Sequence, residues 1–167
     1  IHMSAADLKP LLQAKPRLTL AVAESLTCGR VQAAIGAVSG ASEYFLGGVT
    51  AYTIDQKVEL LGVNRRVAAR VNCVSTEVAQ AMAQGACRLF GSDLALATTG
   101  YAEPSPKAGV AAPFAWWAIA HRRRGRFVAL RTGRIECPGE PRVEVQQMVA
   151  AAVIAELVGY LKKLRGE

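Results

Sequence analysis

Histidine is almost absent from this chain, which has two histidines among its 167 residues. One is His2, at the extreme N-terminus, and the other is His121, in a basic segment between two strand-like runs. A serine–histidine–aspartate site needs a histidine as the general base beside its serine, so this class of hydrolase is excluded. If the chain carries a serine nucleophile, the remaining candidate base is a lysine, which is a known variant of the same logic.

Cysteine is present but lacks the spacings that build disulfide frameworks or metal sites. The four cysteines are Cys28, Cys73, Cys87 and Cys137, with no CxxC pair and no neighbouring pair of histidines. A chain of this length with no visible secretion signal is not expected to depend on disulfides. The ligand spacing also disfavours a bound metal. We therefore expect reduced thiols, a cytoplasmic location and no metal.

Long hydrophobic runs are missing as well, although hydrophobic residues make up 51% of the chain. Glycine, serine or a charged residue interrupts each apolar stretch within about ten residues, short of the roughly 18 that span a bilayer. No membrane partner is therefore predicted. Residues 1–3 are interpreted as a cloning remnant, and residues 4–167 as one domain, because no linker, repeat or low-complexity segment divides them.

Positive charge exceeds negative charge, giving a net charge of +7 and a pI of about 9.6. This balance favours anionic partners such as phosphates. The densest basic segment, residues 121–126, is interpreted as the solvated turn of a hairpin. A nucleic-acid patch remains the less favoured alternative, because no aromatic residues are interleaved with the basic ones.

The hydrophobic pattern alternates between strands and helices. Short apolar runs at 18–23, 45–53 and 93–98 predict buried strands, and 112–120 with 127–135 predict a hairpin. Helical spacing follows at 5–14, 31–38, 53–62, 64–70, 75–90 and 142–165. Helices between strands are typical of the α/β class, here a three-layer α/β/α sandwich with a mixed, largely parallel sheet.

Polar side chains gather just after the predicted strands, where open α/β sheets bind ligands. Ser25 and Thr27 follow the first strand, Tyr52 and Lys57 the second, and Thr99 the third. Each also has an ordinary structural interpretation, as a helix cap, a strand end or a turn.

Arg142 is a further candidate for ligand binding. It lies in the first turn of the last predicted helix, where the helix dipole disfavours a cation. This placement favours an anion nearby, which a guanidinium can bind in bidentate fashion.

Taken together, these segments resemble the CinA C-terminal domain family, the nicotinamide-nucleotide amidases. The segment AESLTCG at 23–29 is similar to the family's AES-x-TGG, and it is followed by GAS at 40–42, Gly47-Gly48-Val49, Tyr52 and Lys57. LGV at 61–63, VSTEVA at 74–79, TGYAEP at 99–104 and Arg142 continue the likeness, which covers residues 8–164.

The resemblance implies an activity and a set of roles. It implies hydrolysis of nicotinamide mononucleotide to nicotinate mononucleotide and ammonia, with no cofactor and with homo-oligomers of two or more chains. Ser42 matches the nucleophile, and Lys57 and Tyr52 match the groups that activate it. The residues that match the binding site of the phosphorylated nucleotide are Ser25, Thr27, Gly29, Thr99, Gly100 and Arg142.

Elementary chemistry is compatible with these roles. A lysine acts as a base near neutral pH only when burial or nearby cations lower its pKa. Backbone N–H groups in the turn after Ser25 are expected to hold the phosphate or the developing oxyanion.

Some positions depart from the family's pattern. Cys28 replaces the first glycine of the pair after Thr27, Glu103 replaces a glycine, and the segment 105–114 is shortened and altered. The alternative hypothesis is therefore a nucleotide-binding or regulatory domain of the same fold that has lost turnover.

Overall fold

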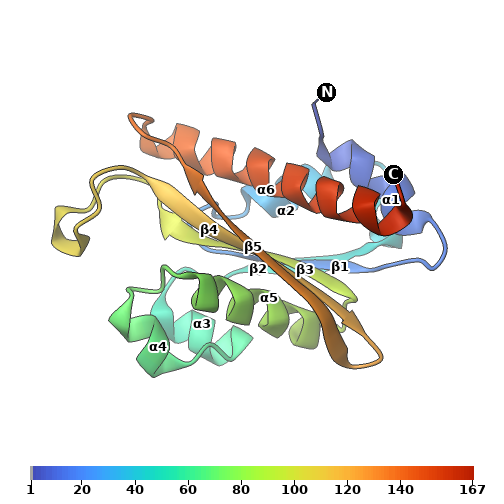
Figure 1. Ribbon diagram of the computed structural model, residues 1–167, viewed down its shortest axis with the longest axis horizontal. Helices are drawn as coiled ribbons and strands as arrows, with labels where there is room; N and C mark the ends of the chain where they lie inside the picture. The colour runs from blue at the N-terminus through green and yellow to red at the C-terminus, as the bar shows by residue number, and fades with distance from the viewer. Residues whose placement is uncertain (1) are drawn as a thin grey trace.

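The computed structural model describes residues 2–167, and Figure 1 shows a central sheet with helices on both faces. The strands are β1 (Leu20–Glu24), β2 (Phe45–Thr50), β3 (Leu94–Tyr101), β4 (Phe114–Arg123) and β5 (Arg126–Glu136), in the order β2-β1-β3-β4-β5. β1 is parallel to β2 and β3, whereas β3–β4 and β4–β5 are antiparallel. The α/β class and the mixed sheet are confirmed, and two of the four strand pairings are antiparallel.

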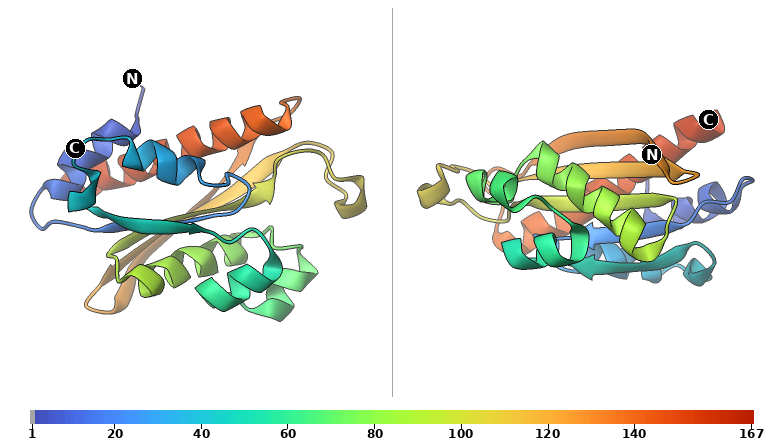
Figure 2. Two further views of the ribbon diagram at one scale, coloured as in Figure 1. Left: turned by 180° about the vertical axis from the view of Figure 1, so that it is seen from behind. Right: turned by 90° about the horizontal axis from the view of Figure 1, so that it is seen from below.

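Two helical layers cover this sheet (Figures 1 and 2). One layer holds α1 (Leu8–Gln13), α2 (Arg30–Gly36) and α6 (Arg142–Arg165). The other holds α3 (Ile54–Leu61), α4 (Arg65–Arg70) and α5 (Thr76–Phe90). Single turns of 3₁₀ helix lie at Ala5–Asp7, Ala41–Glu43 and Pro106–Ala108.

Side-chain size differs between the two faces of the sheet. In β1, Leu20 and Val22 enter the core under α6, while Ala21 and Ala23 face α5. Successive side chains of a strand point to opposite faces, so one strand contributes side chains to the hydrophobic cores on both faces of the sheet. The alanines leave room for α5 to pack closely against the sheet, and α3 in turn packs against α5.

The last helix, with 24 residues, is long enough and contains a stretch apolar enough to span a membrane, by length and composition alone. It is the one such helix within residues 2–167. One face of it is buried against the sheet through Val145, Val149, Val153, Leu157 and Leu161, whereas Val143, Met148 and Leu164 are exposed. This packing is that of a core helix.

Local signals set the helix ends as predicted. The Thr53 side chain accepts the Gln56 N–H at the start of α3, and Ser75 accepts the Val78 N–H at the start of α5. Gly62 ends α3 in the left-handed conformation that glycine adopts most easily.

The basic segment 121–126 is less exposed than predicted. β4 continues through Arg123, so the turn itself consists of Arg124 and Gly125. His121 is buried and its Nδ1 lies 2.7 Å from the Tyr160 hydroxyl. Arg122 donates to the carbonyls of Cys87 and Ser92. The interpretation of this segment as a solvated turn is therefore wrong for its first two residues.

Candidate functional site

A pocket of about 450 Å³ lies beyond the carboxyl ends of β1 and β3. Its volume falls within the range of roughly 300–1,000 Å³ typical of small-molecule sites. The predicted residues that line it are Ser25, Tyr52, Lys57, Thr99, Gly100 and Arg142. Segments far apart in the sequence thus meet at the sheet edge where the topology places ligand sites.

Lys57 is the central side chain of this pocket. It lies on the second turn of α3, and its Nζ is 2.9 Å from the Ser25 Oγ and 2.9 Å from the Tyr52 carbonyl oxygen. Although it lines the pocket, the residue is only 1% exposed. No carboxylate forms an ion pair with it among residues 2–167.

This environment favours the neutral amine. Burial lowers the pKa of Lys57 below its usual value, and a weaker interaction with the Cys73 thiol opposes that effect. A neutral Nζ has a lone pair that can accept the proton of the Ser25 hydroxyl at the observed distance. The pair therefore has the geometry of a nucleophile and its base.

The turn after β1 fixes Ser25 in place. The Ser25 N–H donates to Thr98 Oγ1 at 3.4 Å, and Thr27 Oγ1 lies 2.8 Å from the same atom. Thr27 is fully buried and does not line the pocket. Gly29 also lies outside the pocket lining. It precedes α2 and has a φ of 90°, a left-handed conformation at the start of that helix. The prediction that Thr27 and Gly29 contact the ligand is not supported, because both shape the turn.

The amino end of α2 is already occupied by a side chain of this chain. The buried carboxylate of Glu24 accepts the N–H groups of Val31 at 2.9 Å and Gln32 at 3.0 Å. A carboxylate is favourable there because it satisfies free N–H groups at the positive end of the helix. These two N–H groups are not available to a ligand phosphate, and the expectation that the turn after Ser25 holds an anion now concerns the N–H groups that precede α2.

Ser42 does not lie next to Lys57, so the predicted Ser42–Lys57 pair is wrong. Ser42 is exposed in the 3₁₀ turn before β2, whereas Lys57 follows the other end of that strand. A strand of six residues spans about 20 Å. Figure 2 shows the segment before β2 near the chain termini, with α3 at the opposite end of the sheet. Ser25 occupies the position at Lys57 that was predicted for Ser42.

Tyr52 and Arg142 form the rim of the pocket. The Arg142 guanidinium donates to the Tyr52 hydroxyl at 2.7 Å and to the Glu103 carboxylate at 3.0 Å. The Tyr52 hydroxyl thus contacts Arg142, and only the Tyr52 backbone carbonyl contacts Lys57. The role of Tyr52 in activating the nucleophile stays a prediction, and in this structure its hydroxyl has no hydrogen bond to Ser25 or Lys57 within residues 2–167.

Two lining residues, Asn72 and Cys73, were missed from the sequence. They join α4 to α5 in left-handed conformations, with φ of 47° and 62°. Asn72 donates to the Tyr101 hydroxyl, and the Cys73 carbonyl accepts the Thr99 hydroxyl. Thr99 therefore anchors this loop. The sequence offered one indication of this loop, because asparagine adopts the left-handed backbone conformation more readily than most residues. That preference does not predict that the loop packs against the pocket.

Burial also acts on the thiol in this loop. Cys73 is buried beside Lys57, and burial raises the pKa of its thiol, while the neighbouring lysine acts in the opposite direction. The neutral thiol is thus the favoured form, consistent with an apolar wall of the pocket.

Fold and pocket together define a class of protein: an α/β/α domain with a mixed five-stranded sheet and a buried serine–lysine pair at its carboxyl edge. A model of the CinA C-terminal domain matches residues 3–161. The chain belongs to the CinA C-terminal domain family, which confirms the resemblance identified from its motifs.

Individual relatives agree with this assignment. A CinA-like protein of Chlorobium limicola is 36% identical over 154 residues, which are 92% of this chain and 36% of that protein. A CinA-like protein of Geobacter metallireducens is 49% identical over 87 residues, which are 52% of this chain and 21% of that protein. The chain thus spans about a fifth to a third of the length of these curated relatives.

Solved structures match over nearly the whole chain. A competence-damaged protein (CinA) superfamily protein of Klebsiella pneumoniae has a TM-score of 0.85 at 28% identity, covering 95% of this chain and 96% of that chain. A protein of the same superfamily from Enterobacter cloacae has a TM-score of 0.85 at 26% identity, covering 95% and 93%. These structures confirm the predicted fold.

Proposed function

We propose that the chain is an amidohydrolase that uses Ser25 as nucleophile and Lys57 as general base. The observation that carries the proposal is the 2.9 Å contact between Lys57 Nζ and Ser25 Oγ, at a buried lysine that has no acidic partner among residues 2–167. Membership of the CinA C-terminal domain family supports a hydrolase of this kind.

The proposed reaction follows from this pair. Neutral Lys57 takes the Ser25 proton while Oγ bonds to the carboxamide carbon, and the resulting ammonium then gives that proton to the leaving nitrogen. Ammonia departs and leaves an acyl ester on Ser25. A water molecule, deprotonated by Lys57, cleaves the ester, releases the carboxylate and restores the hydroxyl.

We propose nicotinamide mononucleotide, or a related nucleotide, as the substrate. The resemblance of the motifs to nicotinamide-nucleotide amidases supports the carboxamide. Arg142 at the rim supports an anionic group, because a guanidinium can bind a phosphate through paired N–H groups. The free cysteines support the cytoplasm as the compartment, and the resemblance supports a homo-oligomer.

Ammonia release from nicotinamide mononucleotide tests this proposal. Wild type should release ammonia and nicotinate mononucleotide in equal amounts, and Ser25→Ala should not. A coupled ammonia assay with chromatography of the products measures both. If wild type binds the nucleotide but releases no ammonia, the amidase proposal is refuted.

A second candidate function is nucleotide binding without turnover. Departures from the family's pattern favour it, because Glu103 and the start of the altered segment at Ser105 lie in the pocket lining and change how a nucleotide is positioned relative to Ser25. Nucleotide-induced thermal stabilisation of equal size in wild type and Ser25→Ala, without ammonia release, would support this function.

A further inference from the structure

The charge balance of the pocket depends on one carboxylate. Among the residues that line it, Lys57 and Arg142 are the basic side chains and Glu103 is the acidic one. Arg142 and Glu103 form an ion pair at the rim, with a nitrogen–oxygen distance of 3.0 Å, and their charges cancel. The rim of the pocket is thus close to neutral although the chain as a whole is strongly basic.

Glu103 forms this ion pair with Arg142, whose guanidinium would bind an anionic ligand. One terminal nitrogen of Arg142 donates to Glu103 at 3.0 Å and the other donates to the Tyr52 hydroxyl at 2.7 Å. A phosphate that approaches this guanidinium must displace the carboxylate or lie beside it. Displacement loses the ion pair, and coexistence places two negative groups together.

We propose that Glu103 is a specificity-determining residue that reduces the pocket's preference for phosphorylated ligands over their dephosphorylated nucleosides. The inference rests on the proposed function, because that function assigns the ligand phosphate to Arg142. The substrate class then includes carboxamide nucleosides as well as nucleotides. The reaction at Ser25 and Lys57 is the same for both.

The expected effect is moderate, because the ion pair is exposed. The side chains of Arg142 and Glu103 are 43% and 61% exposed, so solvent screens their interaction. A phosphate carries a charge of about −1.5 to −2 at neutral pH, which strengthens its repulsion by Glu103. Neutralising Glu103 should increase the preference for the phosphorylated ligand by about five- to tenfold.

The test compares Glu103→Gln with wild type. Glutamine keeps the size of the side chain and an oxygen for Arg142, so the variant removes charge rather than the contact. Calorimetry gives the dissociation constants of nicotinamide mononucleotide and nicotinamide riboside, and their ratio measures the preference for phosphate. The ratio should shift in the variant toward the mononucleotide, and the shift should shrink as salt is raised.

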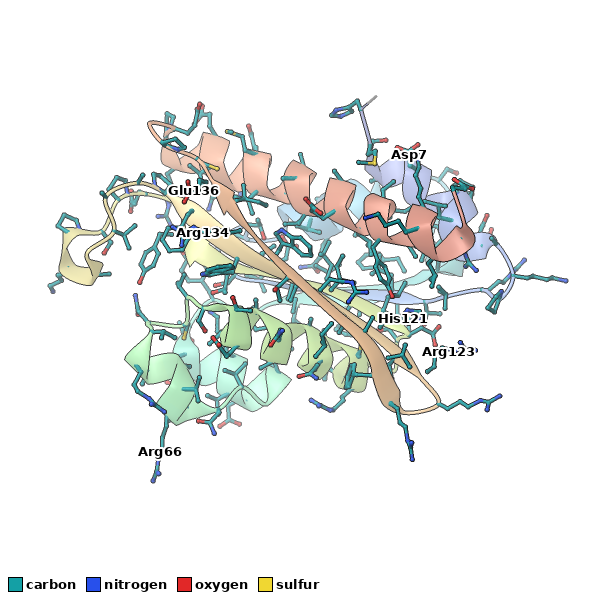
Figure 3. All side chains as sticks on the ribbon, viewed as in Figure 1. Asp7, Arg66, His121, Arg123, Arg134 and Glu136 are labelled. Atoms are coloured by element: carbon teal, nitrogen blue, oxygen red, sulfur yellow. The ribbon has the colours of Figure 1, made fainter. Side chains whose placement is uncertain are left out.

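A matched control lies outside the pocket. The ion pair between Arg134 and Glu136 on β5 has the same N–O distance of 3.0 Å, with side chains 41% and 66% exposed. Figure 3 labels both residues. Glu136→Gln removes the same unit of charge and should leave the ratio unchanged.

The possible outcomes separate this inference from the amidase proposal, because binding requires no turnover. A shifted ratio in Glu103→Gln alone supports the inference even if no variant releases ammonia. An unchanged ratio overturns it even if ammonia is released. An equal shift in Glu136→Gln also overturns it, because the ratio would then follow the net charge of the protein and not the contact at the pocket. If neither ligand binds to wild type or to Glu103→Gln, the inference is overturned as well.

Discussion

The contact between Ser25 and Lys57 predicts that the two residues act as a unit in catalysis. Ser25→Ala removes the hydroxyl that lies 2.9 Å from the amine. Lys57→Met removes the amine but keeps an unbranched side chain at a residue that is only 1% exposed. A positioned general base contributes about 10²- to 10⁴-fold. At about 1.36 kcal/mol per tenfold, this is about 2.7–5.4 kcal/mol of transition-state stabilisation.

Each single substitution should therefore lower kcat/KM by at least about 100-fold, and the double variant should lose little more than the worse single variant. Without the base the serine is a weak nucleophile, and without the serine the base has no proton to take, so the losses are not additive. Initial rates of ammonia release from nicotinamide mononucleotide measure the three values. Circular dichroism checks that each variant is folded.

Ser42→Ala is the matched control, because Ser42 is an exposed serine outside the pocket lining. It should change kcat/KM by less than about twofold, in line with surface substitutions away from special features. A loss of activity in Ser42→Ala with activity retained in Ser25→Ala would refute the reasoning. So would multiplicative losses in the double variant.

Four further predictions concern the pH dependence of activity and of stability, the packing of α5 and the amino end of α2. Activity should rise with pH through the lowered pKa of Lys57, because the neutral amine is the base; a profile that falls over that range would contradict this role. Between that pKa and about 10.4 the unfolded chain keeps a proton on Lys57 that the folded chain has lost, so the free energy of unfolding of wild type should rise with pH relative to that of Lys57→Met, as measured by denaturant titration of both. A methyl group on Gly85 would meet the backbone of Leu61, so Gly85→Ala should destabilise the fold by about 1–3 kcal/mol, whereas Gly159→Ala, with open space around it, should not. Glu24→Gln should lower the midpoint of urea unfolding by an amount equivalent to about 1–3 kcal/mol, because the buried carboxylate accepts two N–H groups of α2; an unchanged midpoint would show that the charge is not needed there.

Local signals were sufficient for most of the fold. Short apolar runs and helical spacing indicated every strand and long helix. The hydroxyls of Thr53 and Ser75 and the left-handed Gly62 marked helix ends that the structure confirms. These features depend on a few neighbouring residues, so the sequence carries them directly. The share of parallel pairings was harder to predict, because it depends on how a hairpin joins a parallel sheet.

The candidate site was only partly predictable. Ser25 and Lys57 were identified because polar residues after strands meet at one edge of an α/β sheet. Arg142 was identified because a cation in the first turn of a helix favours a nearby anion. The sequence did not predict which of the two serines, Ser25 or Ser42, lies next to Lys57. Both serines lie in loops next to β-strands, but Ser25 follows β1 whereas Ser42 precedes β2. In parallel strands those two ends lie at opposite edges of the sheet.

The sequence by itself determined the element order, the fold class and the family, because hydrophobic period, capping residues and motif order are local properties of the chain. Only the tertiary structure decided which side chains touch. The Lys57–Ser25 contact, the Glu24 carboxylate at the amino end of α2 and the ion pair of Arg142 with Glu103 each join residues from separate elements. Such contacts depend on strand order and helix packing, which place distant residues within a few ångströms of each other.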